Sequence, residues 1–131
     1  MPMLPRSLRP ALLLALLTLL AACANRAPTG VAEVLDRPAE RQLVTGLRLY
    51  DDAQYAESER ALTEALRLDL ASPRDRATAH KTLAFIYCTS QRQADCEAAF
   101  RAARAADPQF QLSKSEQGHP LWAPVYQRSL R

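Results

Sequence analysis

Cysteine is the most chemically distinctive residue of this chain, and its three copies suggest two kinds of chemistry. Cys23 closes an apolar run, residues 11–22, which follows a basic start containing Arg6 and Arg9. A basic start, an apolar stretch and small residues before a cleavage point together make a secretory signal peptide. Because a membrane-spanning helix needs roughly 20 apolar residues, we expect this shorter run to be cleaved rather than retained.

The residues around Cys23 resemble the lipobox of bacterial lipoproteins. Leu20 stands three residues before the cysteine and Ala22 directly before it. The resemblance implies cleavage after residue 22 and lipidation of Cys23, whose acyl chains would contribute about 0.8 kcal/mol of membrane binding per buried CH2. By the same resemblance, Ala24 in place of aspartate implies the outer membrane, with the domain in the periplasm. The alternatives are an ordinary signal peptide with an incidental cysteine, or a buried N-terminal helix.

Cys88 and Cys96 form the second candidate site. They lie on either side of an expected turn between two helices, and such positions in an antiparallel hairpin can meet at one level. Since the envelope outside the inner membrane is oxidising, we expect a disulfide, with two buried free thiols as the alternative. We expect no metal site, because His80 and His119 do not stand at ligand spacing from this pair.

The remaining residues give little indication of an enzyme. The sequence contains no glycine-rich phosphate loop and no His-Glu-x-x-His motif. We expect both His80 and His119 to be structural, and therefore expect no catalysis, no cofactor and no small-molecule substrate. A hydrolase that uses one of these histidines is the enzymatic alternative.

Composition favours one small helical domain. Three glycines and many Ala, Leu, Arg, Glu and Gln residues favour helix, and no segment alternates apolar and polar residues like a strand. Cleavage would lower the formal charge from +3 to +1, and no basic cluster alternates with aromatic residues, so we expect no nucleic acid partner. The expected organisation is a signal peptide at residues 1–22, a lipidated tether at 23–36 and a helical domain at 37–131.

An internal repeat lies in the middle of the chain. Small and large apolar residues recur at an offset of 38, a pattern typical of two closely packed antiparallel helices. The unit resembles a tetratricopeptide repeat, a helical hairpin of about 34 residues, with extra residues in the loop between the two units. The matched pairs are Gly46 with Ala84, Ser58 with Cys96, Leu62 with Phe100, and Ala65 with Ala103.

The pattern predicts an all-α fold of two tetratricopeptide-like hairpins and a capping helix. We expect the four hairpin helices at about residues 38–51, 55–69, 73–90 and 94–106. A capping-box pattern spans residues 113–116. The last helix, about 120–130, would cover the open end of the repeats with Leu121, Trp122, Val125 and Leu130. In the alternative, Trp122 and Tyr126 remain exposed as a patch that binds a partner.

The inner helices of such repeats line a concave groove that accepts a segment of a partner protein. Several groove residues are larger and more apolar than a solvated face requires. In the alternative, the C-terminal tail folds back and fills the groove. The expected groove residues are Glu40, Leu43, Leu47, Tyr50 and Asp51 from the first helix, and Thr78, Lys81, Phe85 and Thr89 from the third.

The chain also resembles a more specific family, the TssQ-type lipoproteins associated with type VI secretion systems. The resemblance covers the lipobox, both repeats and residues 81–88, 96–100, 107–112 and 118–126, the last containing Gly118-His119-Pro120 and Trp122. It implies an accessory, non-enzymatic lipoprotein that holds a protein partner, expected to be a secretion-system component, near the outer membrane. The alternative is an envelope adaptor of the same build that serves pilus or outer-membrane assembly.

Overall fold

The computed structural model describes Glu33 and residues 36–131. Within these residues the protein is all-α, with six helices, labelled α3 to α8, and no strand. The expected signal peptide, Cys23 and most of the expected tether lie outside the described residues. Among the helices that the structure describes, none combines the length and the apolar character needed to cross a membrane.

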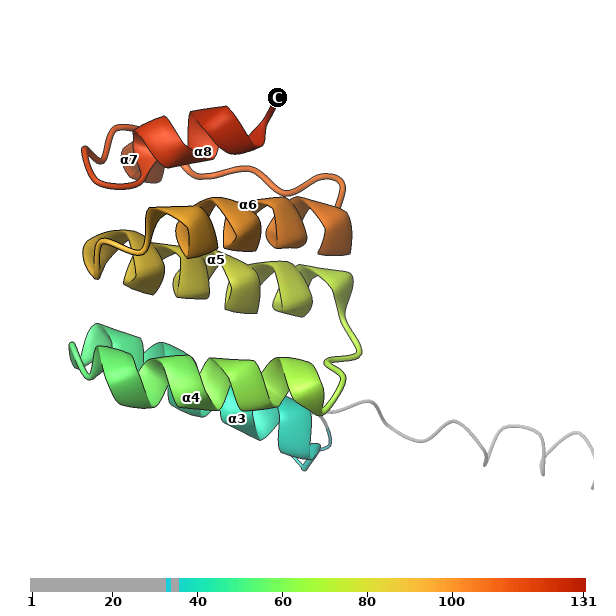
Figure 1. The fold of residues 1–131 in the computed structure, drawn as a ribbon. Coiled ribbons are helices and arrows are strands. Elements are labelled where there is room, and N and C mark those ends of the chain that lie inside the picture. The colour runs from blue at the N-terminus through green and yellow to red at the C-terminus, as the bar shows by residue number, and fades with distance from the viewer. Residues whose placement is uncertain (1–32, 34–35) are drawn as a thin grey trace, which may run out of the picture. The chain divides into compact units, whose positions relative to one another are not determined.

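Two helical hairpins form the body of the domain. Helix α3 (Pro38–Asp51) packs along α4 (Tyr55–Arg67), and α5 (Pro73–Thr89) packs along α6 (Gln93–Ala106). The second hairpin stacks on the first, and a short α7 (Lys114–Gln117) and α8 (Ala123–Ser129) follow on the far side of α6 (Figure 1). The tail therefore covers one end of the stack.

Proline and serine residues set the starts of the inner helices. Pro38 and Pro73 both stand in a first turn, where the missing N–H is not needed. The Ser72 side chain also accepts a hydrogen bond from the Asp75 backbone N–H at 3.3 Å and so caps α5. Helix α4 ends at Arg67, two residues earlier than we predicted, because Asp69 adopts the left-handed conformation with φ of 63°.

The turns inside the two hairpins have the same backbone geometry at an offset of 38 residues. Ala53 and Gln91 are left-handed, with φ of 59° and 61°. Gln54 and Arg92 follow them, both with φ of −87° and ψ of 68°. Each of these second residues donates a backbone hydrogen bond of 2.8 Å into the preceding helix. The two tight turns are thus copies of one structure.

Small residues let the paired helices approach closely. Gly46 is the clearest case, because a Cβ built there would lie 2.6 Å from Cγ of Leu62. The matching position of the second hairpin holds Ala84, which is fully buried. The residues at the paired-helix contacts with no exposed surface are Ser58, Leu62, Ala65, Cys96, Phe100 and Ala103.

The tail departs from the sequence prediction at its helix start. Helix α8 begins at Ala123, so Pro120 precedes it and only Pro124 stands in its first turn. Val125 and Tyr126 are buried, at 1% and 4% exposure, and pack on the hairpin. The prediction that Leu121 and Leu130 belong to the buried apolar side of this helix was wrong, since they are 48% and 40% exposed. The alternative of an exposed Tyr126 was also wrong.

Candidate functional site: the inner face of α3 and α5

A single stripe of side chains runs along α5. Arg74, Thr78, Lys81 and Phe85 recur at intervals of three or four residues, so they lie on one face of the helix. The Lys81 ammonium stands 5.6 Å from the centre of the Phe85 ring, a distance suited to a cation–π contact. The stripe thus passes from a polar end to an apolar end along the helix.

Aromatic rings extend this stripe onto α3. Tyr50 lies with its ring centroid 6.4 Å from that of Phe85 and 5.5 Å from that of Tyr55. Tyr50 and Leu47 are half-buried, whereas Leu43 is only 6% exposed and belongs to the core. Burial, followed by the neighbouring Tyr55 and the carboxylates of Asp51 and Glu116, raises the pKa of the Tyr50 hydroxyl. Tyr50 is therefore neutral at physiological pH.

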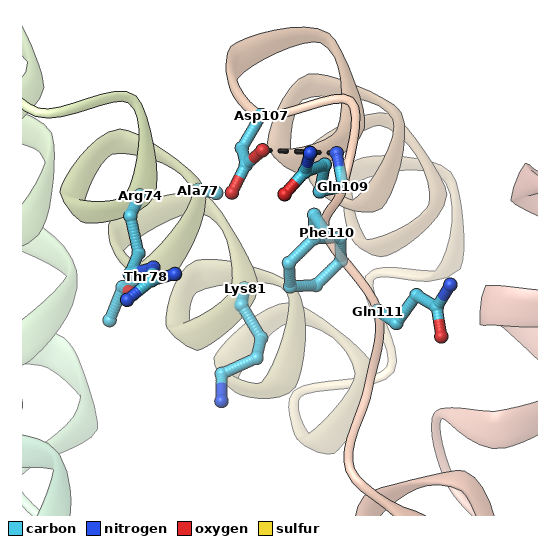
Figure 2. A pocket seen from close by; sticks show the side chains of 8 residues that line it. All are labelled: Arg74, Ala77, Thr78, Lys81, Asp107, Gln109, Phe110 and Gln111. Atoms are coloured by element: carbon cyan, nitrogen blue, oxygen red, sulfur yellow. Dashed lines mark hydrogen bonds between the residues drawn. The ribbon is translucent and has the colours of Figure 1, made fainter.

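A polar pocket of about 270 Å³ adjoins the stripe, between α5 and the connector that follows α6 (Figure 2). Asp107 lies at the start of this connector and accepts a hydrogen bond from the Gln109 backbone N–H at 3.0 Å. We did not predict the pocket, because it needs the connector to return alongside α5. The lining residues are Arg74, Ala77, Thr78, Lys81, Asp107, Gln109, Phe110 and Gln111.

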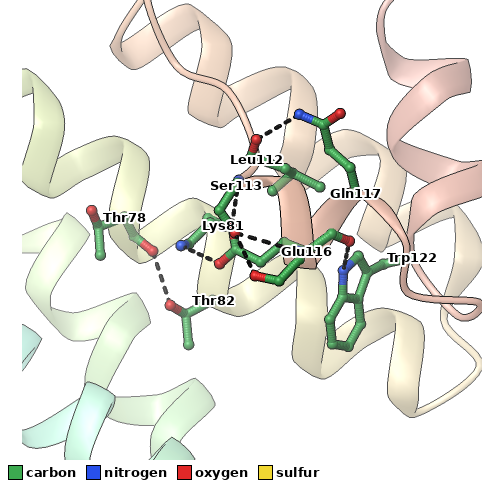
Figure 3. Close-up of polar contacts among 9 residues, drawn as sticks. Thr78, Lys81, Thr82, Leu112, Ser113, Glu116, Gln117 and Trp122 are labelled. Carbon is green, nitrogen blue, oxygen red and sulfur yellow. Dashed lines mark hydrogen bonds and ion pairs between the residues drawn. The ribbon is translucent and has the colours of Figure 1, made fainter.

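The tail covers the Lys81 and Phe85 part of the inner face. Figure 3 shows Glu116 of the tail beside Lys81. The Lys81 ammonium pairs with a carboxylate oxygen of Glu116 at 2.7 Å. The Trp122 ring stacks on Phe85 with centroids 4.2 Å apart, and its Nε1–H donates to the Glu116 carbonyl at 2.9 Å. Phe85, expected on an accessible surface, is only 5% exposed, because Trp122 covers it and because Tyr50 and Phe100 also pack against it. The tail thus lies over Lys81 and Phe85, two of the residues expected to line the groove.

The Glu116 carboxylate is tied into the cover on both sides. It pairs with Lys81, and it accepts a hydrogen bond from the Ser113 backbone N–H at 2.8 Å, completing the capping box of α7. Burial by itself raises the pKa of this carboxyl group. The hydrogen bonds from Lys81 and Ser113 outweigh the effect of burial, so the pKa of Glu116 is lowered from its ordinary value.

The two histidines have different surroundings. His119 stacks on the outer side of Trp122, with centroids 3.4 Å apart and planes 3° from parallel. His80 lies on α5, where burial lowers the pKa of its imidazole. No group of three His, Cys, Asp or Glu side chains within the described residues is close enough to hold a metal ion.

The cysteine pair of the second hairpin is joined. The sulfur atoms of Cys88 and Cys96 are bonded, with Cα atoms 5.2 Å apart, and both residues are buried. The structure thus contains the pairing expected from the sequence. The bond ties the end of α5, the helix that carries the stripe, to the start of α6.

Comparisons with protein-family models, with curated proteins and with solved structures find no match for this chain. Its function is therefore inferred from its own residues and their geometry.

Proposed function

We propose that this chain is a membrane-anchored, periplasmic adaptor lipoprotein of two tetratricopeptide-like repeats, an accessory component of a type VI secretion system that binds a protein partner near the outer membrane. The observation that carries the proposal is the likeness of the two hairpins at an offset of 38 residues. Turn geometry and buried small residues agree between them. Stacked helical hairpins of this kind present their inner helices as a binding face.

The inner face has the composition of a protein-binding surface. Leu47 and Tyr50 supply apolar area, which Tyr55 at the start of α4 extends, and the α5 stripe supplies a cation at Lys81. Tyrosine is enriched at the energetic centres of protein interfaces. This mixture supports the recognition of a partner segment.

The lipobox at Cys23 supports the anchor in this proposal. A domain tethered by lipid acts where it is held, because the membrane keeps the partner surface at a high local concentration. Changing Cys23 to serine is expected to leave a folded domain that binds its partner in solution but has no effect in the cell. Retained cellular function after that change would remove the anchor from the proposal.

Site-specific photo-crosslinking in native membranes tests the adaptor function. A photoreactive phenylalanine analogue at Tyr50 samples the inner face, and the same analogue at Thr63, exposed on α4, is the matched control. We expect an adduct with one protein from position 50 and not from position 63. Equal adducts from both positions, or none, would contradict an inner-face binding site.

Identification of the crosslinked protein by mass separates the two envelope functions. A secretion-system component supports the proposal as stated. A pilus or outer-membrane-assembly component would replace it with the alternative adaptor role.

A further inference from the structure

Residues 113–122 form a segment that lies over α5 while being held mainly at its ends; we call it the cover. The residue before it, Leu112, is 3% exposed, and Val125, shortly after it, is 1% exposed. Between these two anchors, helix α7 contributes no buried residue. Movement of this segment would uncover Phe85 but would leave Leu112 and Val125 in the core on either side of it.

The cover is organised by its own contacts. The capping box joins Ser113 to Glu116, and the Trp122 indole bonds to the Glu116 carbonyl. His119 stacks on the same indole. Among the hydrogen bonds, ion pairs and ring stacks of the described residues, only the Glu116 ion pair and the Trp122 ring stack join the cover to α5. Both partners on α5 are side chains, so the cover can detach as a unit.

These two contacts show what the underlying surface binds. Lys81 takes a carboxylate, and Phe85 takes a flat aromatic ring six residues further along the same segment. The Lys81 and Glu116 side chains are 25% and 24% exposed, so water reaches this pair and weakens it. A detached cover would expose Phe85 beside Tyr50, making one apolar surface with Lys81 at its edge.

We propose that Lys81 and Phe85 form a peptide-binding site that the cover occupies within the same molecule, and that its external ligand is a protein segment carrying a carboxylate and an aromatic ring spaced like Glu116 and Trp122. The proposal deepens the adaptor function and rests on it for the existence of such a partner. A tethered segment competes for the site at an effective concentration of about millimolar, so the cover lowers the apparent affinity of the site for the external ligand. It thereby sets a threshold for partner binding.

Titration with a synthetic peptide of residues 113–122 tests this site. The receptor is the mature domain with Glu116→Ala and Trp122→Ala, which removes both contacts of its own cover with α5. We expect the labelled peptide to bind this double variant about tenfold or more tightly than the wild type, because the competing segment is gone. Fluorescence anisotropy measures the affinity, and circular dichroism establishes that the variant is folded.

Two controls make the result specific. Leu121→Ala changes an exposed residue of the cover, 48% exposed, and leaves both contacts in place, so its affinity should equal that of the wild type. Adding Lys81→Ala to the double variant should lower its affinity for the peptide several-fold. Glu116→Lys, which places two like charges together and keeps the apolar contacts, replaces the double variant if the latter unfolds.

Two outcomes would overturn the proposal: a folded, uncovered variant that fails to bind the peptide, or a wild type that binds it equally well. Neither outcome depends on a cellular partner. Absence of a crosslink at Tyr50 would instead count against the adaptor function and would leave the peptide measurement standing.

Discussion

Ser58 and Cys96 occupy equivalent positions in the two hairpins, and each joins its helix pair by a different bond. The Ser58 hydroxyl donates to the Gly46 carbonyl at 2.7 Å, whereas Cys96 is bonded covalently to Cys88. Both residues are fully buried. A buried hydrogen bond contributes about 1 kcal/mol net, so the second hairpin is the more firmly joined of the two.

Reduction of the disulfide is expected to destabilise the domain. Closing a loop of eight residues contributes about 2.5 kcal/mol in the chain-entropy description. Urea unfolding with and without a thiol reductant should show this difference in the free energy of unfolding. The double variant Cys88→Ala, Cys96→Ala is the control, and its unfolding should not respond to the reductant. An equal response of both proteins would mean that the reductant acts elsewhere.

Gly46→Ala is expected to cost about 1–3 kcal/mol of stability, because the added methyl group overpacks a closed helix pair. The new Cβ would meet the Leu62 side chain at 2.6 Å and its backbone nitrogen at 3.2 Å. Gly118→Ala is the matched control, since its nearest neighbour, the Ser115 carbonyl, stands at 3.8 Å. Thermal unfolding of the two variants compares them directly. Equal melting temperatures would show that α3 and α4 shift apart without penalty.

Acid is expected to release the cover. The pKa of Glu116 is lowered in the folded protein from an ordinary value of 4.5, so the docked cover favours the ionised carboxylate. Its stabilisation is complete above the unfolded pKa and is lost as the pH falls through the folded pKa. Trp122, the single tryptophan of the chain, reports this change by its fluorescence as the pH falls below the ordinary value of 4.5.

Glu116→Gln is the control for the acid titration. Its amide cannot ionise, so the fluorescence change assigned to the cover should be missing from this variant. An unchanged titration curve would assign the event to another carboxyl group.

Stability is also expected to fall in mild acid because of His80. Burial lowers the pKa of its imidazole in the folded state from 6.5, so below pH 6.5 the unfolded chain takes up a proton that the folded chain does not. The free energy of unfolding should therefore decline from about pH 7 until the folded pKa is reached, and level off there. His80→Gln should flatten this part of the profile. An unaltered slope in that variant would exclude His80 as its source.

The helices of the hairpins could be predicted because their signals are local. Pro38 and Pro73 mark two helix starts, and the spacing of small and large apolar residues sets the faces. The cysteine pairing was also within reach, since Cys88 and Cys96 flank one tight turn. Errors at helix ends came from backbone conformation, as at Asp69, which the sequence pattern does not reveal.

The state of the candidate site could not be predicted. Covering of the groove depends on Phe85 and Trp122 meeting across 37 positions of sequence, and on an ion pair between Lys81 and Glu116. The sequence pattern is compatible both with an open groove and with a groove filled by the tail. Pro120 likewise stays outside the helix, although proline is acceptable in a first turn, and the residue before it, His119, stacks on Trp122.

The left-handed residues of the two hairpin turns offer a way to stabilise the domain. Ala53 and Gln91 adopt φ near 60°, which disfavours any residue with a Cβ, and neither lies on the inner face. Glycine at each position removes the strain of the Cβ but loses more backbone entropy on folding. The net effect is expected to raise the free energy of unfolding by about 0.5–1 kcal/mol. The domain thus contains two exposed positions at which a more heat-resistant version can be made without altering the proposed binding surface.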